Sequence, residues 1–394
     1  MKKVLATILA LVMAIGLCSV SWADEGVTTA EALNTAVGAG GEVKLGADIS
    51  ATITIPADKT VTLNLNGKTL TGSIVNKGTL TVTGTGKVVA TAAKTAAVAN
   101  FPDGTVTLSG GTYESANWYV IKNMGKMYIN GPVNVQKPQN STDTSSLIDN
   151  GWYGSTDTVA NEQVQAQAGK AKLFISSGTF TGRSGEKSCS VVKNDDYGVL
   201  EISGGTFDST ANTGTSNATT LLNWNIATIS GGTFKGMYPI SNGASTGEAD
   251  KGQITITGGE FIGTSTIFGS GQGGNAMGSV TVSGGTFTAP ALGAVYDNVD
   301  GGYTLTVSGG TFRNATGAKV DVSDYLENGK QQNADGSVST PSSGGYYYYQ
   351  PTTDTKADDT KGSPKTFDAG IALYVGMALT SAAGVAFVGK KRED

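Results

Sequence analysis

Two aromatic residues, Trp152 and Tyr153, stand beside the carboxylates Asp149 and Asp157 in a polar stretch of the chain. Aromatic side chains stack on the apolar faces of sugar rings, and carboxylates accept hydrogen bonds from sugar hydroxyls. The four residues together predict a ligand site for a glycan. A structural alternative remains open, in which this segment is a lid packed over the molecule with Trp152 buried.

Catalytic chemistry has weaker candidates. The adjacent carboxylates Asp195 and Asp196 could share the acid and base roles of glycoside hydrolysis, and Arg183 offers a cation nearby in sequence. The chain contains no histidine, so Cys189 has no imidazole to activate it as a nucleophile. A single cysteine in a repeat is typically a small core residue. We therefore predict no catalytic residues, no metal site and no cofactor.

The elements that position these residues follow from a repeat. A phrase close to Ile-Ser-Gly-Gly-Thr-Phe recurs along the chain, and its closing aromatic returns every 25 to 27 residues. A period of this length indicates stacked supersecondary units, each too small to bury an apolar face alone. We expect the closing aromatics to form one ladder in a continuous core: Phe180, Phe207, Phe234, Phe261, Phe287 and Phe312.

Each repeat has the pattern of short strands. Apolar residues such as Val280 and Val282 alternate with hydroxyl side chains, which is the period of a β-strand. The glycine pair before the aromatic, for example Gly284 and Gly285, predicts a bend that needs a positive φ. A further apolar patch follows most of the aromatics and predicts a third strand. Such a repeat suits one coil of a parallel β-helix.

The predicted fold class is all-β, a single-stranded parallel β-helix with about 25–27 residues per coil. It resembles the pectate-lyase-like β-helices, and this resemblance implies a right-handed coil. The β-helix is predicted over residues 47–350, with an insertion loop at 136–171 that carries the predicted glycan site. A flexible stalk rich in small and polar residues follows at 351–362.

A short helix is predicted before the first coil, in the region 24–46. Ala30, Leu33 and Val37 fall on one helical face, a hydroxyl residue precedes them and Gly38 follows. An amphipathic helix here would cover the unpaired edge of the first coil, which otherwise exposes its backbone groups to other chains.

The two ends of the chain predict export and anchoring. Residues 1–23 have the basic start, apolar run and small-residue end of a secretory signal peptide. Residues 369–389 carry no charge and are long enough for a transmembrane helix, and the basic tail 390–394 is expected to stay in the cytoplasm.

A motif at 363–368, Ser363, Pro364, Lys365 and Thr366 before Phe367, precedes this span. The motif, the apolar span and the basic tail together resemble the cell-wall sorting signal of Gram-positive surface proteins. The resemblance implies that a sortase cuts after Thr366 and joins the chain to a cell-wall peptide. Two positions depart from the family, with Ser363 in place of the commonest Leu and Phe367 in place of the usual Gly.

As a whole the chain resembles adhesin-like, cell-wall-anchored β-helix proteins. This resemblance implies an extracellular protein, held by the cell wall or by a single pass through the plasma membrane. Its expected partners are sortase, a cell-wall peptide, and a glycan or a host or matrix surface. A net charge of −5 argues against nucleic acid. A passive structural surface module and a polysaccharide lyase or hydrolase remain as alternatives.

Overall fold

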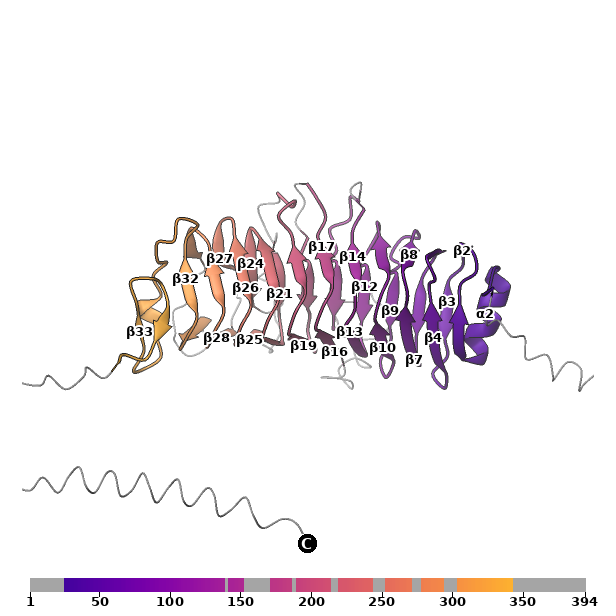
Figure 1. Cartoon of the computed structure of the whole chain (residues 1–394), viewed down its shortest axis with the longest axis horizontal. Helices are drawn as coiled ribbons and strands as arrows, with labels where there is room; N and C mark the ends of the chain where they lie inside the picture. Colours follow the sequence, from indigo (N-terminus) through magenta and orange to yellow (C-terminus); the bar gives the residue numbers. More distant parts are fainter. Residues whose placement is uncertain are drawn as a thin grey trace, which may run out of the picture. The chain divides into compact units, whose positions relative to one another are not determined.

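The computed structural model describes residues 25–138, 141–151, 171–185, 189–213, 219–243, 252–270, 278–293 and 303–342. Within these residues the chain runs through three parallel sheets of 11, 11 and 10 strands, visiting each sheet once per coil (Figure 1). Neighbouring strands of one sheet come from successive coils. The predicted parallel β-helix is thereby confirmed, and the arrangement is consistent with the right-handed coil that the resemblance implied.

Sheet 1 begins each coil. Its strands are β1 (Gly41–Lys44), β4 (Thr60–Asn64), β7 (Thr79–Thr83), β10 (Thr105–Leu108), β13 (Lys126–Ile129), β16 (Lys172–Ile175), β19 (Val199–Ile202), β22 (Ile226–Ile229), β25 (Gly252–Ile256), β28 (Gly278–Val282) and β31 (Tyr303–Val307).

Sheet 2 follows the bend after each strand of sheet 1. Its strands are β2 (Ile49–Ser50), β5 (Lys68–Thr71), β8 (Gly86–Ala90), β11 (Thr112–Ser115), β14 (Asn134–Gln136), β17 (Thr179–Thr181), β20 (Thr206–Asp208), β23 (Thr233–Gly236), β26 (Glu260–Gly263), β29 (Thr286–Thr288) and β32 (Thr311–Arg313).

Sheet 3 completes the coil and supplies the third strand that the sequence predicted. Its strands are β3 (Ile53–Ile55), β6 (Ile74–Asn76), β9 (Val98–Asn100), β12 (Ile121–Asn123), β15 (Ile148–Asn150), β18 (Val192–Asn194), β21 (Thr219–Asn223), β24 (Tyr238–Asn242), β27 (Thr266–Ser270) and β30 (Ala291–Gly293). Strand β15 lies inside the stretch predicted as an insertion, and it pairs in register with β12 and β18.

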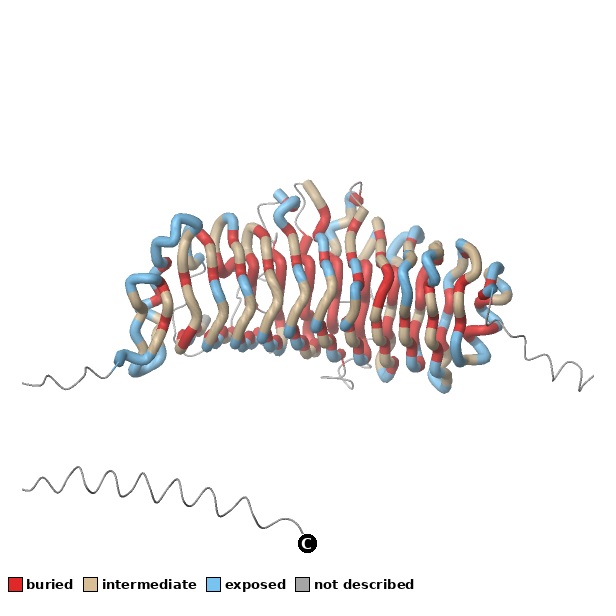
Figure 2. The backbone as a smooth tube through the Cα atoms, in the orientation of Figure 1, coloured by how far each residue is buried: buried red, intermediate tan, exposed pale blue. Residues whose placement is uncertain are grey.

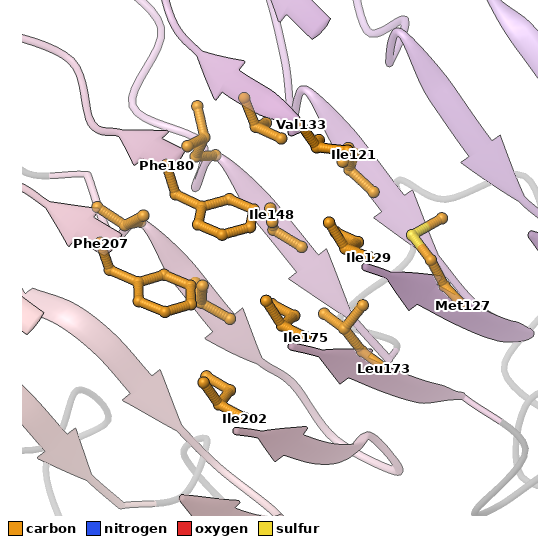
Figure 3. Close-up of a cluster of buried hydrophobic side chains, with 14 of the residues drawn as sticks. Ile121, Met127, Ile129, Val133, Ile148, Leu173, Ile175, Phe180, Ile202 and Phe207 are labelled. Carbon is orange, nitrogen blue, oxygen red and sulfur yellow. The ribbon is translucent and has the colours of Figure 1, made fainter. Parts of the chain in front are cut away.

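The core lies between the three sheets. Buried residues alternate with less buried ones along sheets 1 and 2, so buried segments recur in every coil (Figure 2). The six predicted aromatics are fully buried, and neighbouring rings stack at centroid distances of 4.5 to 4.9 Å. The predicted ladder is therefore confirmed, and Figure 3 shows its first two members, Phe180 and Phe207, beside the isoleucines of the other sheets.

The two positions of each glycine pair require glycine for different reasons. The second glycine of the pair has a positive φ, for example 95° at Gly232. Residues that carry a Cβ rarely adopt this backbone conformation. The first glycine is required by close approach, because a Cβ on Gly231 would collide with the carbonyl oxygen of Ser203 in the preceding coil. The predicted bend is confirmed. The positive φ explains the second glycine of the pair, and the close approach of the preceding coil explains the first.

Both ends of the coil stack are covered. Helix α2 (Ala30–Ala39) packs Leu33, Ala36 and Val37 into the core, and the Thr29 hydroxyl caps it by accepting a bond from the Ala32 amide at 3.1 Å. The helix runs past the predicted end, and Gly40 rather than Gly38 forms its C-cap at a φ of 86°.

After β32 the chain forms a second cap. It contains the 3₁₀ turn η1 (Ser323–Tyr325) and the antiparallel pair β33 (Gln331–Gln332) and β34 (Val338–Ser339). Three valines of this segment are buried at the end of the core: Val320, Val322 and Val338.

A ladder of buried asparagines marks the corner between sheets 3 and 1. Each side-chain amide except that of Asn242, the last member, donates from Nδ2 to Oδ1 of the asparagine in the next coil, at distances of 2.7 to 2.8 Å. The same amides also donate to backbone carbonyls, as Asn150 does to Val199 O at 3.1 Å. Its members are Asn76, Asn100, Asn123, Asn150, Asn194, Asn223 and Asn242.

Several predicted segments lie outside the described residues. They are the signal peptide 1–23, the stalk 351–362, the sorting motif 363–368 with Ser363, Pro364, Lys365 and Thr366, the span 369–389 and the tail 390–394. In the part of the chain that is described, no helix has the length and apolar character needed to cross a bilayer. Anchoring therefore stays a prediction.

Candidate functional site

The outer face of sheet 1 carries a row of threonines with one interruption. In the successive strands β4, β7 and β10 the outward residue at the same register position is a threonine, and the same holds from β22 to β31. Between these two runs the row contains Tyr128, Phe174 and Glu201, which lie directly beside one another in β13, β16 and β19. We name these three residues the sheet 1 platform.

The alternation of strands directs the platform residues outward. In β16, Leu173 and Ile175 are buried and point into the core (Figure 3). Because side chains alternate along a strand, Phe174 between them faces the outside. Tyr128 is placed in the same way between Met127 and Ile129. Both rings are half-buried, whereas Glu201 is exposed.

The two rings stack on one another beside charged groups. Their centroids are 5.0 Å apart and their planes differ by 17°. Lys126 places its ammonium 5.1 Å from the centroid of Tyr128 and 5.9 Å from that of Phe174. A hollow of about 250 Å³ beside the rings is lined by platform residues together with Asn130, Ser176, Ser203, Thr228 and Ser230.

This arrangement has the parts needed to bind a sugar. The stacked rings offer apolar surface beside the hollow for a sugar ring, and a carboxylate, an amide and several hydroxyls line the hollow as hydrogen-bond partners. Because Glu201 is exposed, it can reach a ligand without losing a buried partner.

The glycan site predicted from the sequence is only partly within the described residues. Asp149 is fully buried in β15, where it contacts the ammonium of Lys122. Trp152, Tyr153 and Asp157 lie outside the described residues. Whether these four residues bind a glycan therefore stays a prediction.

Asp149 belongs to a buried charge cluster on the outer side of sheet 3, made of Lys122, Asp149, Lys193 and Asp195. The first three stack directly above one another in β12, β15 and β18. Lys193 Nζ lies 2.8 Å from Asp195 Oδ2 and 3.8 Å above the ring centroid of Trp224. Burial raises the pKa of Asp195 to about 8, and the charge of Asp149 acts in the same direction against the lysines.

The remaining catalytic candidates are also buried. Asp196 is 4% exposed and Arg183 is 8% exposed, so a polymer on the surface does not reach them directly. The thiol of Cys189 donates to Ser145 O at 2.9 Å, and burial raises its pKa. In the described ranges no group of three His, Cys, Asp or Glu side chains could hold a metal ion.

No protein-family model, curated protein or solved structure matches this chain. The function is therefore inferred from the geometry of the site. The sheet 1 platform was missed in the sequence because β13 lacks the Gly-Gly-Thr-Phe phrase, so its register with β16 was not visible. The available signal was the outward position of each strand, aligned coil by coil, where aromatics replace threonine.

Proposed function

We propose that this protein is exported, displayed on the surface of a Gram-positive cell and binds a glycan at the sheet 1 platform. Export and display rest on the sequence patterns at 1–23 and 363–394. The observation that carries the binding proposal is the stacked pair of Tyr128 and Phe174 on the outer face, with Glu201 next in the row.

The contrast with the rest of the same face supports the proposal. An aromatic ring on an outer strand position leaves apolar surface in contact with water, which a threonine in that row does not. Two adjacent rings, a carboxylate and a hollow occur together at three consecutive strands of sheet 1. A sugar ligand would account for the rings, the carboxylate and the hollow together, because pyranose rings have apolar faces and hydroxyl edges.

The test is a glycan array probed with the purified protein, followed by affinity measurement on the best ligand. Tyr128→Ala and Phe174→Ala should each weaken binding about fivefold, because stacking on one ring contributes roughly 1 kcal/mol. Glu201→Gln should weaken binding about tenfold, because a hydrogen bond to a charged acceptor contributes about 1.5–3 kcal/mol and the amide keeps part of it.

Glu260→Gln is the matched control. Glu260 is an exposed carboxylate at the start of β26 in sheet 2, away from the platform row. This variant should bind as the unaltered protein does. Equal affinity in all four variants would reject the platform, and an array without any bound glycan would favour the passive structural module.

A further inference from the structure

An asparagine that precedes a glycine is chemically labile, because no Cβ on the glycine hinders attack of its amide nitrogen on the asparagine side chain. The attack needs a glycine nitrogen that is free to lose its proton. A hydrogen bond from that N–H therefore separates protected pairs from reactive ones. The chain contains this pair of residues five times: Asn66 and Gly67, Asn130 and Gly131, Asn150 and Gly151, Asn242 and Gly243, and Asn328 and Gly329.

The backbone hydrogen bonds divide the five pairs into two groups. In three of them the glycine N–H donates to a carbonyl oxygen of a neighbouring coil, at 2.6 Å from Gly67 and at 2.9 Å from both Gly151 and Gly243. Within the described residues, the amides of Gly131 and Gly329 have no such acceptor. These two glycines therefore keep a nitrogen that is available for attack.

Asn130 combines the available nitrogen with a polarised side-chain carbonyl. It is exposed and follows directly after β13. Ser109 Oγ donates to Asn130 Oδ1 at 3.0 Å, and a donor at this oxygen stabilises the negative charge that develops there when the nitrogen attacks. Asn328 is also exposed, but its side chain has no such donor in the part of the chain that is described. Asn130 is therefore the more reactive of the two.

We propose that Asn130 is a site of spontaneous deamidation, which adds a second carboxylate to the hollow beside the sheet 1 platform. The Gly131 nitrogen loses its proton to water and attacks Asn130 Cγ, so that a new C–N bond forms. The bond from Cγ to Nδ2 then breaks, and Nδ2 leaves as ammonia with a proton from water. A second water hydrolyses the cyclic imide to aspartate or isoaspartate. No oxidant or reductant is needed.

The consequence for the hollow rests on the proposed function. Asn130 and Glu201 both line the hollow. Because Asn130 Oδ1 accepts from Ser109, Nδ2 is the group that Asn130 offers to a ligand, and it has no acceptor among the described residues. Deamidation replaces this donor with a carboxylate oxygen. A sugar oxygen that accepts from Nδ2 loses its partner, so the deamidated protein should bind the glycan more weakly.

Mass spectrometry of the full chain during incubation at mildly alkaline pH tests the modification. Each deamidation raises the mass by about 1 Da. Fragment masses of the peptide that begins at Met127 should place the first change at Asn130, ahead of Asn328, with Asn150 unmodified. Asn130→Gln should show no change at this position, because its longer side chain closes a less favourable ring. An intact Asn130 in a chain that has deamidated at Asn328, or a mass that stays constant, would overturn the assignment.

Ser109→Ala tests the role of the hydroxyl. This variant should slow deamidation at Asn130 several-fold, because the donor to Oδ1 is gone. The rate at Asn328 in the same molecule should stay the same, which makes Asn328 an internal reference. Unchanged rates at both positions would overturn the role of Ser109.

Glycan affinity tests the effect on the hollow. Asn130→Asp carries the product from the start and should bind the array ligand about fivefold more weakly, because one hydrogen bond is lost. Asn328→Asp, the same change at an exposed residue of the C-terminal cap, should bind as the unaltered protein does. Equal affinity of the two variants would overturn the effect on the hollow. An array without a bound glycan would reject the proposed function, and the mass measurement decides the modification in either case.

Discussion

The asparagine ladder gives the sharpest test of how the coils are held in register. Asn150 lies inside the ladder, accepting from Asn123 Nδ2 at 2.7 Å and donating to Asn194 Oδ1 at 2.7 Å and Val199 O at 3.1 Å. Asn150→Ala removes all three hydrogen bonds. It leaves Asn123 without this acceptor and Asn194 Oδ1 without this donor, both in a buried corner.

The expected loss of stability follows from these orphaned groups. A buried polar group without its partner costs about 1–3 kcal/mol, so two such groups give about 4 kcal/mol for Asn150→Ala. Asn117→Ala is the matched control, because Asn117 is exposed and makes one side-chain bond, to Thr91 O at 2.9 Å. That variant should lose less than about 1 kcal/mol.

Urea denaturation and amide hydrogen exchange measure the difference. Each coil of a solenoid contacts only its neighbours, so exchange should accelerate most in β15 and β18, next to the substitution. Equal denaturation midpoints and equal exchange for Asn150→Ala and Asn117→Ala would refute the view that the ladder fixes the register of these coils.

A second substitution at the same position separates hydrogen bonding from packing. Asn150→Asp keeps the shape, but its carboxylate has no hydrogen to donate to Asn194 Oδ1 or Val199 O. At neutral pH this variant should be less stable than Asn150→Ala, and acidification should narrow the gap because the protonated acid can donate one bond. Wild-type stability of Asn150→Asp at neutral pH would contradict the donor role.

Three further predictions concern the core, the buried acid and the chain end. Phe234→Ala should cost about 3–5 kcal/mol, and Phe312→Ala about 1 kcal/mol less because Phe312 stacks on one ring instead of two; equal losses in denaturation would contradict the stacking contribution. The raised pKa of Asp195 means that the folded protein holds one more proton than the unfolded chain between pH about 4 and 8. Stability should therefore fall as pH rises through this window, by up to about 1.4 kcal/mol per unit, and Asp195→Asn should flatten the slope of thermal denaturation against pH. Protein released by muralytic digestion should end at Thr366 with an attached wall fragment, and an intact C-terminus in peptide mass spectrometry would contradict sortase processing.

The sequence contains enough to predict the scaffold because the scaffold is periodic. Period-two alternation, glycine pairs and an aromatic every 25 to 27 residues are local signals, and each coil repeats them. The Phe ladder and the three strands per coil follow directly. The asparagine ladder is harder to predict, since its members end strands of sheet 3 that are separated by connections of unequal length, so that consecutive members are 19 to 44 residues apart.

The functional sites are also hard to predict, because they depend on pairing between coils across connections of unequal length. The sequence predicts the glycan site in the segment 136–171, because this segment breaks the repeat. Asp149 of that segment instead stacks between Lys122 and Lys193, a placement that depends on pairing across long and unequal connections. No local pattern in the sequence of one strand reveals which residue lies beside it in the next coil.

The two unusual features of the fold occupy neighbouring coils. The sheet 1 platform lies on β13, β16 and β19, and the buried charge cluster centres on β12, β15 and β18. In a solenoid, departures from the repeat are tolerated singly because coils contact only their neighbours. Here the departures on the two sheets lie in consecutive strands and fall in the same few coils. The ion pair between Lys122 and Asp149 joins β12 to β15 within these coils. Lys122→Met leaves the Asp149 carboxylate buried without this cation, so hydrogen exchange should accelerate more in the coils that present the platform than in the distant coils.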